Sequence, residues 1–194
     1  MKTSENFLTN ILNNKRLSRI LALILLAISV FLQIISQKYL HGDWVFLTFL
    51  ASEWFMLFAI LIPVHLRMKG GLPAISLTKE KPFIFYGIGS GIGILIFVLF
   101  MLVAVISKVY AFNGLANPIS WGMIILFAIA FIGQSAFEEV IFRGILMHFI
   151  AKRRSKLLGI IISSVVFSLV HMPGGNATVV TFINIVLISI LFSL

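Results

Sequence analysis

Two adjacent glutamates and an arginine lie inside the apolar segment FEEVIFRGIL, Phe137–Leu146. Charged groups are expensive to keep away from water, so each of them needs a partner or a chemical role. Glu139 and Arg143 are four residues apart, which places them on one face of a helix with the carboxylate on the N-terminal side. We expect an ion pair between them, which would offset part of the cost of burying either charge.

Glu138 is the carboxylate that this pairing leaves over. On a helix it is rotated by about 100° from Glu139, and the residue four positions after it is Phe142. A carboxylate without a local partner is available to take a proton from water as a general base. A structural interpretation stays open at this point, because such charges also hold helices together or extend toward the membrane surface.

A second group of reactive side chains lies in the segment FSLVHMPGG. Phe167 and His171 are four residues apart on one helix face, and the proline and glycines that follow mark the end of that helix. Glu138 and His171 are equally far along the chain from a point between Arg154 and Ser155, in the basic turn KRRSK. If regular antiparallel helices flank this turn, the carboxylate and the imidazole lie at the same depth, where they can hold a water molecule or a metal ion.

The composition indicates that membrane-spanning helices carry these groups. Hydrophobic residues make up 60% of the chain and charged residues only 11%, whereas soluble domains have about 25% charged residues. The absence of cysteine excludes disulfides and a cysteine nucleophile. We predict an all-α, polytopic transmembrane bundle in a single membrane domain (1–194), with the motifs on a helical hairpin (121–171). About six spans are expected, at Leu17–Ile35, Trp44–Leu66, Phe83–Ile106, Trp121–Ile150, Leu157–His171 and Thr178–Leu194.

The basic residues predict the orientation of these spans. The net charge is +9, and most basic residues lie before the first span, between the second and third, or between the fourth and fifth. The positive-inside rule then places the N-terminus in the cytoplasm, with the basic loops facing anionic lipid rather than nucleic acid. We therefore expect a multi-pass protein of the cell membrane, with the lipid bilayer as a partner and no nucleic-acid partner. The residues are Lys2, Lys15, Arg16, Arg19, Arg67, Lys69, Lys79, Lys81, Lys152, Arg153, Arg154 and Lys156.

The segments EEVIFR and FSLVH together resemble the EExxxR and FxxxH motifs of the CAAX protease and bacteriocin-processing family, also called CPBP or Abi proteins. The matching residues are Glu138, Glu139, Arg143, Phe167 and His171. Either motif alone is weak, but the pair on consecutive predicted transmembrane helices is fairly specific. The resemblance covers mainly the predicted hairpin.

The resemblance implies an intramembrane endopeptidase, a hydrolase in which Glu138 activates water and His171 helps to hold that water or a metal ion. Glu139, Arg143 and Phe167 would support the site. Zinc is the candidate metal of such a metalloprotease, with Glu138 and His171 as ligands, but two protein ligands are too few for a usual zinc site. The implied substrate is a peptide or protein within or at the membrane.

The chain departs from the family in one respect. Family members carry a further histidine, followed four residues later by Asn or Asp, on a later helix. None of the four histidines of this chain is followed in that way, and no histidine comes after His171. We therefore expect a truncated or frameshifted family member that lacks its last helices, and the sequence leaves open whether such an endopeptidase is active or inactive. The alternative is a non-catalytic membrane protein for bacteriocin self-immunity or peptide binding.

Glu53 is a further acidic residue, inside the second predicted span. Intramembrane acids are functional candidates by default. The plainer expectation is that Glu53 is a second partner for Arg143 or forms a hydrogen bond between helices. A proton-coupled carrier using Glu53, Glu138 and Arg143 is a third hypothesis, but the chain shows no inverted repeat to support it.

Overall fold

The computed structural model describes residues 14–67, 70–75, 81–114, 118–172 and 178–194. Within these ranges the regular structure is entirely helical, which confirms the predicted all-α fold. Three of the basic residues used to predict the orientation, Lys2, Lys69 and Lys79, lie outside the described residues. The cytoplasmic N-terminus therefore stays a prediction.

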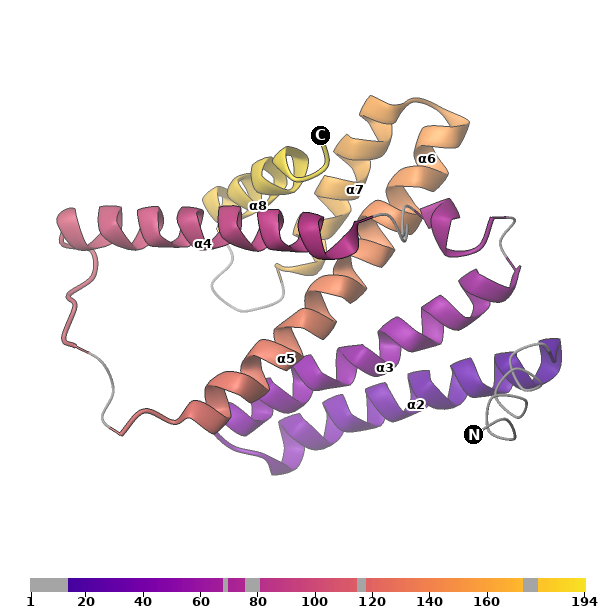
Figure 1. Ribbon diagram of the computed structural model, residues 1–194, viewed down its shortest axis with the longest axis horizontal. Coiled ribbons are helices and arrows are strands. Elements are labelled where there is room, and N and C mark those ends of the chain that lie inside the picture. Colours follow the sequence, from indigo (N-terminus) through magenta and orange to yellow (C-terminus); the bar gives the residue numbers. More distant parts are fainter. Residues whose placement is uncertain (1–13, 68–69, 76–80, 115–117, 173–177) are drawn as a thin grey trace. The chain divides into compact units, whose positions relative to one another are not determined.

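Every predicted span is helical, with bounds close to those expected from the sequence (Figure 1). The fourth span is continuous over 33 residues, Trp121–Arg153, but its middle part, η2, is a π-helix rather than an α-helix. In chain order the elements are α2 (Lys15–Tyr39), α3 (Asp43–Arg67), the 3₁₀-helix η1 (Leu72–Ile75), α4 (Pro82–Ile106), α5 (Trp121–Glu138), η2 (Glu139–Met147), α6 (His148–Arg153), α7 (Lys156–Val170) and α8 (Val179–Leu191).

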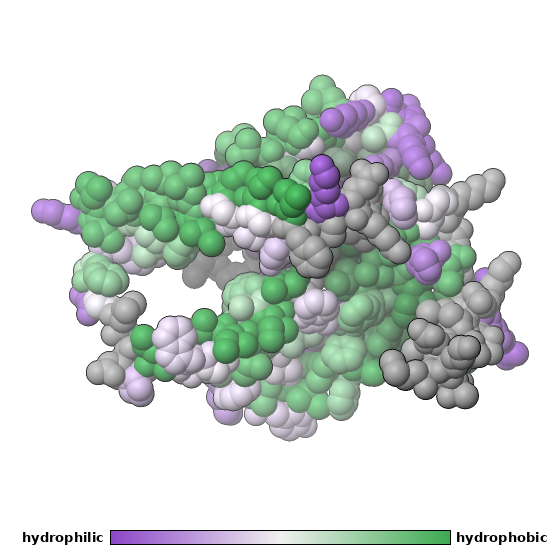
Figure 2. Space-filling model, in the orientation of Figure 1, coloured by the Kyte–Doolittle hydropathy of each residue, from purple (hydrophilic) through white to green (hydrophobic). Residues whose placement is uncertain are grey.

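Four helical stretches are long and apolar enough to cross a membrane, at Arg16–Tyr39, Asp43–Leu66, Ile84–Ile106 and Trp121–Arg153. The helices α7 and α8 are apolar but shorter, with 15 and 13 residues, against the ~20 residues of a simple crossing. Figure 2 shows that the visible surface of α4 is almost continuously hydrophobic, as expected of a helix in contact with lipid. The chain is therefore a membrane protein with four helices that can span the bilayer by length and composition.

Side chains at the helix starts explain where the helices begin. The side chain of Asn14 accepts hydrogen bonds from the N–H groups of Arg16 and Leu17, at 3.0 and 3.3 Å, ahead of α2. Ser155 and Thr178 cap α7 and α8 in the same way, each accepting from the N–H three residues later. Such caps satisfy backbone donors that the helix itself leaves without partners. The cap at Ser155 sets the tight connection between α6 and α7.

The chain divides into two compact units: residues 1–77 with 124–194, and residues 78–123, which contain α4. In the first unit α3 packs along α2, and α7 packs against η2, α6 and α8. The buried core of this unit brings Leu57 and Val64 of α3 together with Ile75 and Val140. The α3 helix and η1 therefore support the segment that carries the two glutamates and the arginine. The single membrane domain expected from the sequence stays a prediction.

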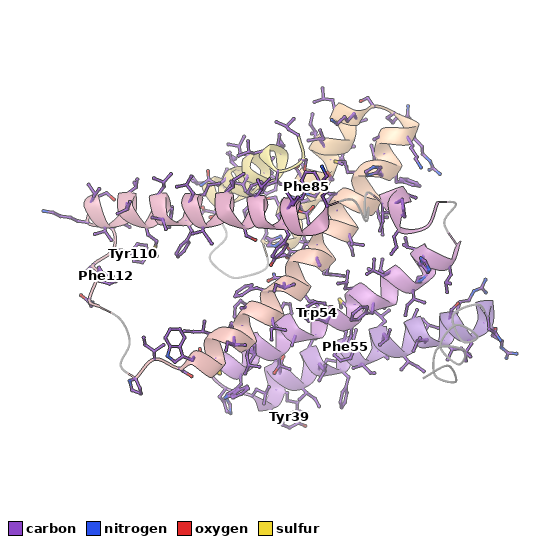
Figure 3. The ribbon with its side chains drawn as sticks, viewed as in Figure 1. Tyr39, Trp54, Phe55, Phe85, Tyr110 and Phe112 are labelled. Atoms are coloured by element: carbon purple, nitrogen blue, oxygen red, sulfur yellow. The ribbon has the colours of Figure 1, made fainter. Side chains whose placement is uncertain are left out.

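Two glycines allow close approach within this unit. The indole of Trp54 occupies the space that a Cβ atom on Gly133 would need, and its Nε1–H donates to the carbonyl oxygen of Ile129 at 3.0 Å. Trp54 lies where α3 meets α5 (Figure 3). A Cβ atom on Gly159 would lie 2.7 Å from the carbonyl oxygen of Met147. Glycine at these positions lets α3 approach α5 and lets α7 approach the end of η2.

Candidate active site

Glu138 and His171 meet across the hairpin of α5, η2, α6 and α7. Oε1 of Glu138 lies 3.5 Å from Nε2 of His171, and the two side chains are 21% and 34% exposed. The premise of two regular helices is wrong, because the π-helix η2 lies between Glu138 and the turn, and its i→i+5 hydrogen bonds wind the chain differently. The two side chains nevertheless lie side by side. The site is thus partly buried but open enough for a water molecule to enter.

A hydrogen bond to the backbone fixes the tautomer of His171. Its Nδ1 atom lies 2.7 Å from the carbonyl oxygen of Phe167. A carbonyl oxygen only accepts, so Nδ1 carries the hydrogen and Nε2 of the neutral ring presents a lone pair. The 3.5 Å between Nε2 and Glu138 is longer than a usual hydrogen bond of about 2.7–3.2 Å. Two acceptor atoms at this separation can both receive hydrogen bonds from one water molecule.

Gln134 holds the carboxylate of Glu138 in place. Its Nε2 atom donates to Oε1 of Glu138 at 3.0 Å, from one helical turn earlier on α5. The prediction that Glu138 has no local partner is therefore wrong. It rested on Phe142, four residues after Glu138, whereas the partner Gln134 lies four residues before it. The i, i+4 spacing of Gln134 and Glu138 is visible in the sequence and could have identified this contact. Between described residues, the hydrogen bond from Gln134 and the contact with His171 both involve Oε1 of Glu138, so Oε2 is available to water.

The expected ion pair of Glu139 and Arg143 forms, with 2.9 Å between Oε1 and Nη1. Arg143 is the more buried partner, at 13% exposed against 57% for Glu139. Its other nitrogens, Nε and Nη2, reach the hydroxyl groups of Ser193 and Ser189 at 3.4 Å, and its guanidinium carbon lies 5.0 Å from the ring centre of Phe167. Arg143 thus connects η2 to both α7 and α8. Sequence reasoning missed the two serines, because nothing in the spacing relates them to the motif.

The ring of Phe167 contacts both the guanidinium of Arg143 and the imidazole of His171. Its centre is 4.4 Å from that of His171, and the ring of Phe142 meets it edge-on, at 5.1 Å and 87°. These contacts restrict the rotation of the imidazole, in addition to the hydrogen bond from Nδ1. Phe167 therefore supports the orientation of His171 through both its ring and its backbone carbonyl.

The π-helix is a feature that the sequence did not reveal. It begins at Glu139, directly after Glu138, and contains Arg143. The ring atom Nδ1 of His148 lies 3.0 Å from the carbonyl oxygen of Arg143, within hydrogen-bond distance. Short π-helical insertions are rare and occur frequently at functional sites. In this chain the π-helix contains Glu139 and Arg143 and directly follows Glu138.

Glu53, the other intramembrane acid, is buried on α3 with 7% of its surface exposed. The expected pairing with Arg143 is not found within the described residues, because Arg143 pairs with Glu139 instead. Its Oε2 atom also has no hydrogen-bond partner there. Within the described residues, Glu53 therefore makes none of the hydrogen bonds or ion pairs that hold Glu138, Glu139 and Arg143.

The donor atoms present do not fit a usual zinc site. Catalytic zinc is held by three protein ligands, and Glu138 and His171 supply two. The described part of the chain contains no group of three His, Cys, Asp or Glu side chains placed to hold a metal ion. The chemistry of the site is therefore derived for water and protein groups alone.

A mainly apolar cavity of about 360 Å³ lies on the side of η2 that carries Glu139 and Arg143. Residues of α3, η1, α5, η2 and α6 form its wall, together with Phe192 and Ser193. Cavities of this size, lined by apolar residues with a few polar groups, are typical of sites for small ligands or side chains. It is therefore a candidate binding space for an apolar side chain or a small ligand.

Residues 118–194 match the family model described as "Type II CAAX prenyl endopeptidase Rce1-like". The matched segment contains both motifs, from Glu138 to His171. Over this part of the chain, the match confirms the resemblance to the CAAX protease family that the two motifs indicated. Neither the curated proteins nor the solved structures gave a significant match to the chain.

Proposed function

We propose that this protein is an intramembrane endopeptidase of the CAAX-protease type, in which Glu138 activates a water molecule to hydrolyse a peptide bond. The observation that carries this proposal is the contact between Glu138 and His171, with 3.5 Å between Oε1 and Nε2, while Nδ1 of His171 lies 2.7 Å from the carbonyl oxygen of Phe167. The match of residues 118–194 to the prenyl endopeptidase model supports it.

In the proposed reaction Glu138 takes one proton from the water molecule. Nε2 of His171 accepts a hydrogen bond from the other O–H of this water and so orients its oxygen toward the peptide carbonyl carbon. The new C–O bond forms as the carbonyl electrons move onto their oxygen. The C=O bond then re-forms, the C–N bond breaks, and the proton on Glu138 passes to the leaving nitrogen. The products are a carboxylic acid and an amine, so atoms and charge balance.

The remaining residues of the site keep these two groups in place. Gln134 holds the Glu138 carboxylate, and the carbonyl oxygen of Phe167 keeps the hydrogen of His171 on Nδ1. Arg143 and Glu139 hold η2 against α7 and α8. The substrate class that follows from the family description is a prenylated peptide or protein ending in a CAAX sequence, presented at the membrane.

The test is the hydrolysis of an internally quenched, farnesylated CAAX peptide by the full chain in lipid nanodiscs. General acid–base catalysis contributes about 10²–10⁴-fold to a rate, so we expect Glu138→Gln and His171→Gln each to lower kcat at least about 100-fold. The matched controls are Asp43→Asn and His41→Gln, which change exposed residues at the start of α3 and just before it. These controls should cleave the peptide at the wild-type rate.

Wild-type rates from both site variants would exclude catalysis by this pair. A wild-type chain that inserts and folds in nanodiscs but cleaves no peptide would instead favour the non-catalytic alternative. In that case, binding of the same farnesylated peptide without cleavage would be the next measurement.

A further inference from the structure

The connection between α6 and α7 carries a dense group of cations, here called the basic turn: Lys152, Arg153, Arg154 and Lys156. All four side chains are exposed. Hydrophilic residues gather at this tip of the hairpin (Figure 2). Four positive charges within five residues repel one another, so the turn is stabilised by any anion that binds to it.

Within the described residues no carboxylate pairs with the basic turn. There the carboxylate of Glu139 pairs with Arg143, and that of Glu138 lies beside His171. Arg153 of the turn contacts an aromatic ring: its guanidinium carbon lies 3.9 Å from the ring centre of Phe149. The positive charge of the turn is thus not neutralised by neighbouring side chains of the described chain.

Exposed apolar side chains flank the cations on both sides. Phe149 on α6 is 52% exposed, and Leu157 on α7 is 67% exposed. Aromatic and apolar side chains beside lysines and arginines are the arrangement found where a helix leaves the hydrocarbon and enters the headgroup layer. An acidic peptide or a nucleic acid would leave these apolar side chains in water, whereas a phospholipid would contact both kinds of side chain.

We propose that the basic turn is a binding site for anionic phospholipids. The four cations of the turn hold the lipid phosphate, and the part of the acyl chains nearest the headgroup lies against Phe149 and Leu157. Guanidinium groups bind phosphate oxygens with two parallel hydrogen bonds, and Arg153 is already oriented by the ring beneath it. The bound lipid would fix the tip of the hairpin that carries Glu138 and His171 at the membrane surface. This binding does not depend on whether the site hydrolyses peptides.

The experiment uses the full chain in a nonionic detergent, with phosphatidylglycerol as the probe and phosphatidylcholine as the neutral comparison. Native mass spectrometry measures how much of each lipid the protein retains. Each basic residue near a membrane surface is worth about a fivefold change in affinity for anionic lipid. Replacing all four cations of the basic turn by glutamine should therefore weaken phosphatidylglycerol binding at least about 100-fold. The control is Lys38→Gln with Lys108→Gln, which removes two basic residues outside the basic turn and should weaken binding less than removing two cations of the turn.

One further variant and one comparison of unfolding temperatures make the result decisive. Arg153→Lys keeps the charge but not the planar group stacked on Phe149, so it should weaken binding only a few-fold. The thermal unfolding temperature without lipid should be the same for all variants, which separates lost binding from lost folding. The proposal is overturned if the fourfold variant retains phosphatidylglycerol like the wild type. It is also overturned if the wild type retains phosphatidylcholine equally well, or if an acidic peptide displaces the lipid and binds more tightly.

Discussion

Replacing Gly133 by alanine tests whether the close contact of Trp54 on α3 with Gly133 on α5 stabilises the fold. The new methyl group would overlap the indole of Trp54, which must then move and give up its hydrogen bond to Ile129. Overpacking costs about 1–3 kcal/mol and the net loss of a hydrogen bond about 0.5–1.5 kcal/mol. Alanine is about 1 kcal/mol better than glycine inside a helix. We therefore expect a net loss of about 1–3 kcal/mol in the free energy of unfolding.

The assay is reversible unfolding in detergent, followed by tryptophan fluorescence and by helix content. The control is the same substitution in a Trp54→Ala background, where the clash no longer exists. There Gly133→Ala should stabilise the protein by about 1 kcal/mol, through helix propensity alone. The sign of the effect should thus reverse between the two backgrounds. An equal effect of Gly133→Ala in both would refute the contact between Trp54 and Gly133 as the cause.

Three further predictions concern the polar groups. Arg143→Met should lower the free energy of unfolding by about 1–3 kcal/mol, because it leaves Ser189 and Ser193 without this partner. Limited proteolysis should then cut α8 faster, and an unchanged cleavage rate would contradict the link to that helix. Gln134→Leu should lower kcat for the farnesylated peptide about tenfold with KM unchanged, because it removes the hydrogen bond that orients Glu138. A change in KM alone would contradict this role of Gln134. Glu53→Gln should leave the free energy of unfolding unchanged or raise it, since the Oε2 atom of Glu53 has no hydrogen-bond partner in the described chain. A decrease of more than about 2 kcal/mol in the free energy of unfolding would contradict this prediction.

Much of the fold could be predicted from the sequence because the signal is local. A span expected at Trp44–Leu66 is the helix Asp43–Arg67, and one expected at Phe83–Ile106 is the helix Pro82–Ile106. A run of about 20 apolar residues needs no knowledge of its neighbours to be identified as a helix of membrane-spanning length. The ion pair of Glu139 and Arg143 was predictable for the same reason, since its partners are one turn apart.

Features that depend on contacts between distant segments could not be predicted in this way. The packing of Trp54 on Gly133 joins residues that are far apart in the chain, and the bonds from Arg143 to α8 do the same. The π-helix has no residue signature among the propensities that distinguish helix from strand. The nearness of Glu138 and His171 was expected from their equal distances to the turn. The spacing did not establish that their faces meet, which the structure shows with a contact of 3.5 Å.

The central claim is that Glu138 and His171 act on one and the same water molecule. The most direct test compares kcat for the farnesylated peptide between Glu138→Gln, His171→Gln and the double variant, in nanodiscs. Residues that act as a unit show strongly non-additive effects, because removing the second group costs little once the first is lost. The account predicts that the double variant is no more than a few-fold slower than the slower single variant. Losses that multiply in the double variant would show that the two groups act independently, and would contradict the proposed site.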